Sequence, residues 1–236
     1  MRLLWLICIC VLFLNCEDTH SKKKKKTVTK QTTIEQKTSE KDSISEDKKN
    51  TYPVLDGLQD AMEFFLEYDK HHKENKVRIT TDFGTIDVLL FNETKFHRAN
   101  FIYLTKRGYF NGTQFYRVIN NFIIQGGNSD DKKTAHKRAE IGKYLLPTDT
   151  NRGFTHERGV LSMPSGEIDN PYKLASPYEF FIVQQHGGSH FLDGDYTVFG
   201  KVIDGMDVVD KIAAVKTDEA DWPLHNVYIR KAEIIN

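Results

Sequence analysis

The stretch GTQFYRVINNFIIQGG, residues 112–127, places a single charged residue in the most apolar run of the chain after its N-terminal segment. Its aromatic and β-branched residues favour two short strands, separated by a break at Asn120 and Asn121. Arg117 lies within the first strand, although arginine is almost never fully buried without a partner. We therefore consider Arg117 a candidate functional residue, with a solvated arginine at a sheet edge as the alternative.

Strand and helix patterns continue on both sides of this stretch. Alternating apolar residues predict a hairpin over 77–91, while 95–108 and 204–215 have apolar residues at helical spacing. The long polar segment up to about residue 157 carries no predicted element. A mainly antiparallel sheet of eight strands tends to close into a barrel, because closure removes its exposed edges. The four strands predicted beyond the polar segment are 159–163, 179–184, 196–203 and 225–235.

The N-terminal 16 residues have the pattern of an export signal. Arg2 is followed by twelve apolar residues, a run too short to span a bilayer but typical of a signal-peptide core. Cys16 stands directly after this run, as in a bacterial lipobox. We therefore predict a signal peptide over 1–16, lipidation of Cys16 and a lipid-anchored protein of the cell envelope. The alternative is an ordinary secretory signal that is cleaved nearby.

Two further segments precede the predicted barrel. Residues 17–50 are rich in Lys, Ser and Thr and poor in apolar residues, so they predict a disordered tether. The alternative is that Lys22 to Lys26 contact anionic lipid or cell-wall polymer. Residues 51–76 predict an amphipathic helix that packs on the following domain, with partner binding as the alternative. Its apolar face contains Leu58, Ala61, Met62, Phe65 and Leu66.

Composition and missing motifs narrow the function classes. Lys+Arg and Asp+Glu both count 33, and a zero net charge does not indicate a nucleic-acid partner. No cysteine follows Cys16, which excludes a disulfide scaffold and thiol catalysis in the remainder of the chain. His186 and His190 lie in a glycine-rich segment rather than on one helix face, which argues against a zinc site. We expect neither a metal nor a cofactor, and a monomer.

Residues 100–128, NFIYLTKRGYFNGTQFYRVINNFIIQGGN, resemble the cyclophilin signature. The blocks RGVLSM, EFFIV and FLDGDYTVFGKVIDGMDVVDKI resemble later parts of the same family, in the same order. The resemblance implies a cyclophilin-like domain over 77–236, a closed eight-stranded antiparallel β-barrel capped by two α-helices. It also implies peptidyl-prolyl cis/trans isomerase activity, here on proline-containing, unfolded or partly folded exported proteins.

The chemistry of this reaction gives Arg117 a role. Rotating a peptide bond costs ~18–20 kcal/mol because conjugation between its nitrogen and its carbonyl is lost. The twisted bond leaves a localised lone pair on the prolyl nitrogen, so a hydrogen bond to this nitrogen stabilises the twisted state more than the planar one. The resemblance implies that Arg117 is this donor and that Gln125 supports it. It places Phe122, Ile123, Phe181 and Leu192 in the proline pocket. Further substrate-binding residues that it implies are Met163, Pro164, Ser165, Glu179, Phe191 and Tyr196.

Glu179 is the main departure from the family pattern, which has Gln at this place, while Tyr116 replaces a His. We expect the Glu179 carboxylate to pair with Arg117, either holding the guanidinium in position or competing with the substrate nitrogen. Competition would make the chain a proline-peptide binding module with low activity. A second alternative is an envelope interaction protein that uses the barrel as a scaffold.

Overall fold

The computed structural model describes residues 52–166 and 170–236. The predicted signal peptide, the lipidation at Cys16 and the tether over 17–50 lie outside the described residues. Within the described ranges, no helix combines the length and the apolar character that crossing a bilayer requires.

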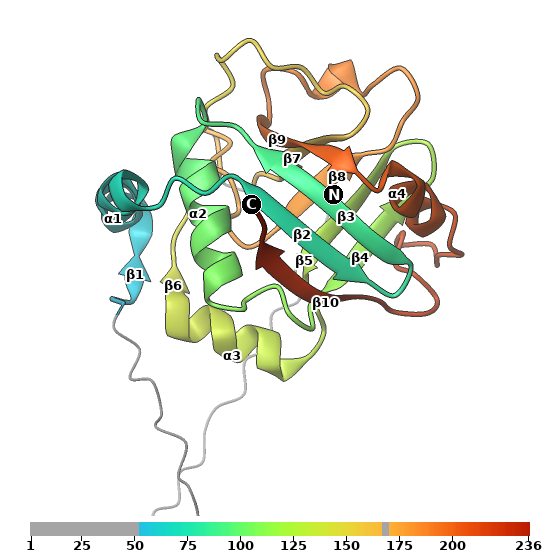
Figure 1. Cartoon of the computed structure of the whole chain (residues 1–236), viewed down its shortest axis with the longest axis horizontal. Helices are drawn as coiled ribbons and strands as arrows, with labels where there is room; N and C mark the ends of the chain where they lie inside the picture. The colour runs from blue at the N-terminus through green and yellow to red at the C-terminus, as the bar shows by residue number, and fades with distance from the viewer. Residues whose placement is uncertain (1–51, 167–169) are drawn as a thin grey trace, which may run out of the picture. The chain divides into compact units, whose positions relative to one another are not determined.

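Eight antiparallel strands form a closed barrel, which confirms the predicted fold class (Figure 1). Their order around the barrel is β10-β2-β3-β9-β7-β8-β5-β4, and pairing of β10 with β4 closes the ring. Closure pairs β10 and β4, the two strands that would be the edges of an open sheet. The strands are β2 (Lys76–Thr81), β3 (Gly84–Leu90), β4 (Gln114–Ile119), β5 (Ile123–Asn128), β7 (Val160–Met163), β8 (Phe180–Val183), β9 (Thr197–Asp204) and β10 (Val227–Ile234).

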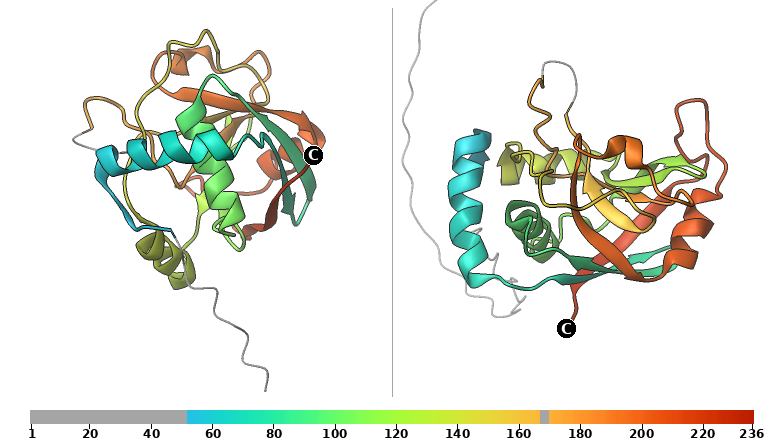
Figure 2. Two further views of the ribbon diagram at one scale, coloured as in Figure 1. Left: turned by 60° about the vertical axis from the view of Figure 1, so that its left-hand side comes forward. Right: turned by 90° about the horizontal axis from the view of Figure 1, so that it is seen from above.

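Both predicted capping helices are present. α2 (Lys95–Lys106) and α4 (Met206–Ala213) lie at opposite ends of the barrel, as the two views of Figure 2 show. The ring of Phe101 from α2 contacts Phe110, Phe180 and Phe199, with ring centroids 4.7, 5.4 and 5.6 Å apart. These aromatic contacts make α2 part of the barrel core rather than a surface addition.

The polar segment after β5 contains a helix that the sequence analysis did not predict. α3 (Lys132–Ile141) begins with the Asp131 side chain accepting a hydrogen bond from Lys133 N at 2.9 Å, a standard N-cap. Only Thr134 and Ile141 of this helix are buried, so it has no apolar stripe from which to predict it. The barrel therefore carries one helix more than expected.

Directly after α3, a short parallel pair joins β1 (Leu55–Asp56) to β6 (Gly142–Lys143). A Cβ on Gly142 would lie 2.0 Å from the Leu55 carbonyl oxygen, and its φ of +133° also favours glycine. Only glycine allows the two backbones to approach this closely. A short 3₁₀ turn, η1 (His190–Leu192), completes the described elements.

The predicted N-terminal helix is α1 (Gly57–His71), and it packs on α2 through apolar and charged contacts. Phe65 and Tyr68 meet the ring of Tyr103, with centroids 5.7 and 5.4 Å away. Asp69 forms an ion pair with Arg98, whose side chain is 2 % exposed. Removing either partner would leave an unpaired buried charge, so this ion pair fixes the position of α1 on α2. Of the predicted apolar face, Leu66 is instead exposed.

His97 on α2 is fully buried, and neither ring nitrogen has a hydrogen-bond partner within the described residues. Burial disfavours the charged imidazolium and lowers the pKa of His97 to about 4. The unfolded chain has the ordinary pKa of 6.5 and binds a proton more readily. The stability that this site contributes is thus fully present above pH 6.5 and is lost as the pH falls toward 4.

We expect acid to destabilise the protein partly through His97. Between pH 7.5 and 4.5 this group should cost about 2–3 kcal/mol of unfolding free energy, and a His97→Leu variant should lack that component. Urea unfolding of both proteins at the two pH values measures the difference. His136→Leu, at a side chain that is 77 % exposed, is the control and should keep the wild-type pH dependence. Equal pH dependence in wild type and His97→Leu would contradict this account.

Candidate active site

The register between β4 and β5 gathers the predicted polar residues on one face. Arg117 lies directly opposite Gln125, and Ile119 lies opposite Ile123. Residues directly opposite in an antiparallel pair project to the same side of the sheet, as do residues two apart on one strand. Arg117, Ile123 and Gln125 therefore share one face, and this face opens onto a cavity.

This cavity has a volume of about 350 Å³ and collects most of the predicted site. Its walls come from β4, β5, β8, the segment after β7 and the region around η1. We call it the β4–β5 cavity. It is lined by Tyr116, Arg117, Phe122, Ile123, Gln125, Pro164, Ser165, Phe181, Leu192 and Tyr196.

One wall of the β4–β5 cavity is apolar. Ile123 and Phe181 belong to a small buried cluster, and Phe122, Leu192 and Tyr196 pack against that cluster. The rings of Phe181 and Tyr196 meet edge to face, with centroids 6.0 Å apart. An apolar wall with a few polar groups opposite is typical of a small-ligand site, and this one suits a compact apolar ring.

Three predicted site residues do not line the cavity. Met163 is 1 % exposed and belongs to the main barrel core. Phe191 is 69 % exposed and stacks on Phe122 at a centroid distance of 5.5 Å, so it lies outside the cavity wall. Glu179 lies beside the cavity and contacts its lining through Tyr116.

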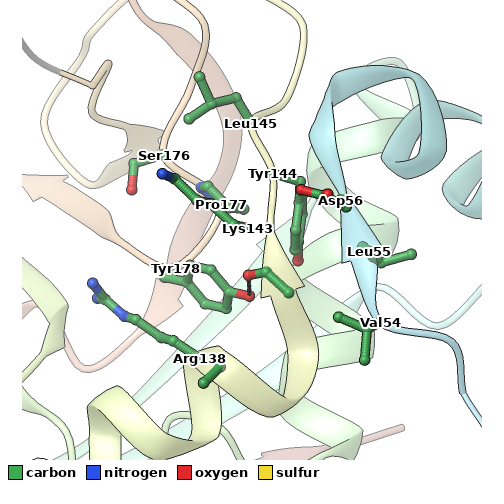
Figure 3. Close-up of a pocket in the computed structure, with 12 residues that line it drawn as sticks. Val54, Leu55, Asp56, Arg138, Lys143, Tyr144, Leu145, Ser176, Pro177 and Tyr178 are labelled. Carbon is green, nitrogen blue, oxygen red and sulfur yellow. Dashed lines mark hydrogen bonds between the residues drawn. The ribbon is translucent and has the colours of Figure 1, made fainter.

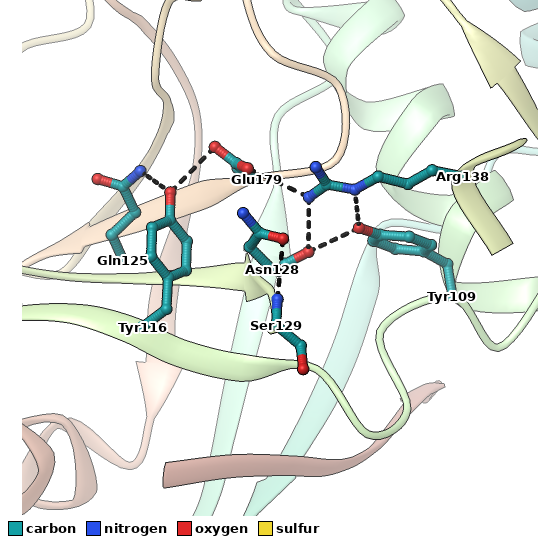
Figure 4. A network of polar contacts seen from close by, with 8 residues as sticks. Tyr109, Tyr116, Gln125, Asn128, Ser129, Arg138 and Glu179 are labelled. Carbon is teal, nitrogen blue, oxygen red and sulfur yellow. Dashed lines mark hydrogen bonds and ion pairs between the residues drawn. The ribbon is translucent and has the colours of Figure 1, made fainter. Parts of the chain in front are cut away.

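Glu179 does not pair with Arg117, and this corrects the sequence-based expectation. Its carboxylate accepts hydrogen bonds from the Tyr116 hydroxyl at 3.0 Å and from Arg138 Nη2 at 3.1 Å (Figure 4). Arg138 belongs to α3, the helix that the sequence did not predict. Its Nε also donates to the Tyr109 hydroxyl at 2.8 Å. The carboxylate is thus neutralised from the side of α3 rather than by the cavity arginine.

The same network holds Gln125. Its amide nitrogen donates to the Tyr116 hydroxyl, which in turn donates to Glu179 (Figure 4). Burial, reinforced by the nearby Glu179 charge, raises the pKa of Tyr116 well above its usual value, so the phenol stays a neutral donor. Gln125 lies opposite Arg117 on the paired strand, but its amide is directed to Tyr116.

Arg117 has a different partner, Asp221. The carboxylate oxygen Oδ2 of Asp221 lies 3.4 Å from Arg117 Nε, and the Arg117 side chain is 41 % exposed. Within the described residues, its two terminal nitrogens have no hydrogen-bond or ion-pair partner. Sequence analysis missed Asp221 because it lies in a polar loop, about a hundred positions from Arg117 in the chain.

His156 is a second residue that sequence analysis missed. Its ring lies parallel to Phe181 at a centroid distance of 5.9 Å, behind the apolar wall. Nδ1 lies 2.7 Å from Asp193 Oδ1, and Nε2 lies 3.1 Å from Ser162 Oγ. Burial lowers the pKa of His156. These contacts connect β7, β8 and the segment after η1 behind the cavity. A single histidine in a polar stretch of sequence does not predict such a role.

A larger cavity of about 510 Å³ lies beside β1, β6 and α3 (Figure 3). None of the predicted site residues lines it. The Tyr178 hydroxyl donates to the Gly142 carbonyl, and Arg138 contacts Glu179. Within residues 52–166 and 170–236, no group of His, Cys, Asp or Glu is arranged to hold a metal ion. The β4–β5 cavity, with its charged donor, is the candidate active site.

Comparisons with known proteins identify the family of this chain. The family model for cyclophilin type peptidyl-prolyl cis-trans isomerases matches residues 76–234. A peptidyl-prolyl cis-trans isomerase from Acinetobacter baylyi is 38 % identical over 60 % of this chain and 73 % of its own length. A peptidyl-prolyl cis-trans isomerase-like 2 from Rhizopus delemar is 37 % identical over 75 % of this chain. The match covers about a third of that relative, 32 % of its length.

A solved structure shows the same fold. The cyclophilin type isomerase of Cryptosporidium parvum, crystallised in the presence of the dipeptide Ala-Pro, has a TM-score of 0.57 and 28 % identity. The similarity covers 68 % of this chain and 99 % of that one. The family match over residues 76–234 and the shared barrel fold show that this chain belongs to the cyclophilin-type peptidyl-prolyl cis-trans isomerase family.

Proposed function

We propose that the chain accelerates rotation about X-Pro peptide bonds, with Arg117 as the catalytic donor. The observation that carries this proposal is a guanidinium beside the apolar wall of a cavity of about 350 Å³, with terminal nitrogens that have no partner within the described residues. The proline ring lies against Phe122, Phe181 and Leu192. As the bond twists, the prolyl nitrogen regains a localised lone pair, and Arg117 donates a hydrogen bond to it.

This hydrogen bond accelerates the reaction because it is stronger in the twisted state than in the planar substrate. Arginine remains charged at any physiological pH and offers several donors in a fixed plane. A charge-assisted hydrogen bond contributes roughly 1.5–3 kcal/mol, which corresponds to ~10–10² in rate. The remainder of the acceleration comes from the apolar wall, which holds the ring while the carbonyl side rotates.

The contacts of Glu179 bear on the alternative of a low-activity binding module. That alternative requires a carboxylate that occupies Arg117. Glu179 is hydrogen-bonded to Arg138 and Tyr116 instead, so it does not occupy the terminal nitrogens of Arg117, which favours an enzyme.

We further propose that the protein works at the cell envelope as a monomer, anchored by a lipid on Cys16. The support is the apolar run that ends at Leu14, two residues before this cysteine, and the polar segment 17–50. Its substrates would be proline-containing exported proteins that are unfolded or partly folded. Unaided X-Pro isomerisation takes tens to hundreds of seconds, which is slow enough to limit their folding.

Replacing Arg117 by Ala should lower kcat/KM for a short X-Pro peptide by about 10–100-fold, because the donor to the prolyl nitrogen is lost. Thermal stability should change little, since the side chain is partly exposed. Arg230→Ala is the matched control, a strand arginine of β10 that is ion-paired to Asp82 and 58 % exposed. An Arg117→Ala variant as fast as wild type would exclude the proposed role.

Replacing Glu179 by Gln should not speed the reaction, because Glu179 does not hold Arg117. The variant should be less stable by about 1 kcal/mol, since it weakens a charged hydrogen bond to Arg138 that is largely shielded from solvent. Isomerase assays and urea unfolding measure the two effects. A several-fold increase in rate would restore the view that this carboxylate restrains the enzyme.

Mass spectrometry of the full-length protein, expressed in a bacterium with lipoprotein processing, tests the anchor. We expect cleavage before Cys16 and an added diacylglyceryl mass on this residue, both lost in Cys16→Ser. An unmodified N-terminus at another position would refute lipidation and favour an ordinary secretory signal.

A further inference from the structure

The second half of β4 lacks its strand partner on one side. Val227 and Tyr228 of β10 pair with Phe115 and Gln114, and no residue of β10 pairs with β4 beyond that point. The β4–β5 register shifts between Phe115 and Arg117, as in a β-bulge, which bends a strand away from its ladder. A loop over 216–224 fills the place of the missing partner.

This loop is held to β4 by its backbone. The carbonyl oxygen of Asp221 accepts a hydrogen bond from Val118 N at 2.9 Å, one residue from Arg117. The ring of Trp222 lies 5.7 Å from that of Tyr116. The position of Asp221 beside Arg117 is therefore a consequence of main-chain and aromatic contacts as well as of charge.

The loop is also closed on itself. The Asp218 side chain accepts hydrogen bonds from Ala220 N and Trp222 N, both at 2.9 Å, and Leu224 N donates to the Lys216 carbonyl at 2.9 Å. Asp221 has a φ of +63°, a left-handed conformation that is uncommon outside glycine but tolerated by Asp and Asn. The loop thus presents the Asp221 carboxylate in a defined direction.

The contact between Asp221 and Arg117 involves one edge of the guanidinium. Oδ2 faces Nε at 3.4 Å, and within the described part of the chain the two terminal nitrogens remain without a partner. A bidentate carboxylate would occupy the donors that the reaction needs. A contact at Nε restrains the flexible side chain while leaving the terminal donors to the substrate.

We propose that Asp221 is the positioning residue of Arg117. It holds the guanidinium beside the β4–β5 cavity before the substrate binds, and so reduces the conformational entropy that Arg117 loses in the twisted state. Gln125, the residue expected to support Arg117, is directed to Tyr116 instead. This inference rests on the proposed isomerase function and on Arg117 as its donor.

A double-mutant cycle tests the proposal in the full-length protein. Asp221→Asn keeps the shape, the backbone bonds and the tolerance for a positive φ, and removes only the charge. It should lower kcat/KM about two- to fivefold, the size expected for coupling between partly exposed charges. In an Arg117→Ala background the same change should have no effect. The loss should also shrink in 1 M salt, where charges are screened beyond about 3 Å.

Glu219→Gln, an exposed carboxylate of the same loop, is the matched control and should leave kcat/KM unchanged. The proposal would be overturned if Asp221→Asn lowered kcat/KM equally with and without Arg117. It would also be overturned if Asp221→Asn raised kcat/KM, since the carboxylate would then compete with the substrate.

The NMR signal of the Arg117 Nε–H group tests the contact independently of activity. Its chemical shift should change in Asp221→Asn and not in Glu219→Gln. An unchanged chemical shift in Asp221→Asn would overturn the contact itself. If the wild-type protein has no isomerase activity but the Arg117 Nε–H chemical shift still changes in Asp221→Asn, the contact stands and the proposed function is overturned. The catalytic part of this inference then falls with that function.

Discussion

The register of β4 against β5 is the constraint on which the site depends. Barrel closure through β10 and β4 leaves β4 little freedom to slide, and a shift of one residue would turn Arg117 away from the cavity. Phe181 on β8 is placed by the same ladder, since it lies directly opposite Gln125. One sheet therefore sets both the charged donor and the apolar wall that it faces.

The charges around this sheet are divided into two separate groups. Glu179 is held from α3 by Arg138, and the Tyr116 phenol lies between that carboxylate and Gln125. Arg117 is contacted from the opposite side by Asp221. Two acidic residues thus lie close to the site, yet neither they nor any other residue of 52–166 and 170–236 occupies the terminal nitrogens of Arg117. Such an arrangement suits the donor role that we propose for Arg117.

Local patterns were sufficient to predict most of the barrel, whereas most of the cavity lining was predicted from the resemblance to the cyclophilin signature. Strand residues such as Ile123 and Phe181 carry a period-two signal, and the Arg117 segment carries a specific motif. α3 could not be predicted, because its ten residues are mostly polar and bury only two side chains. The partner of Glu179 could not be predicted for the same reason, since Arg138 lies on that helix. Asp221 and His156 act through contacts between distant segments, which no local pattern records.

A crystal structure of the protein with a bound X-Pro peptide would test the central claim most directly. Our account predicts that the proline ring lies against Phe122, Phe181 and Leu192, with a terminal nitrogen of Arg117 facing the prolyl nitrogen. Asp221 would remain at the Nε edge of the guanidinium. A peptide bound in the larger cavity beside α3, or an Arg117 side chain directed away from the prolyl nitrogen, would contradict it.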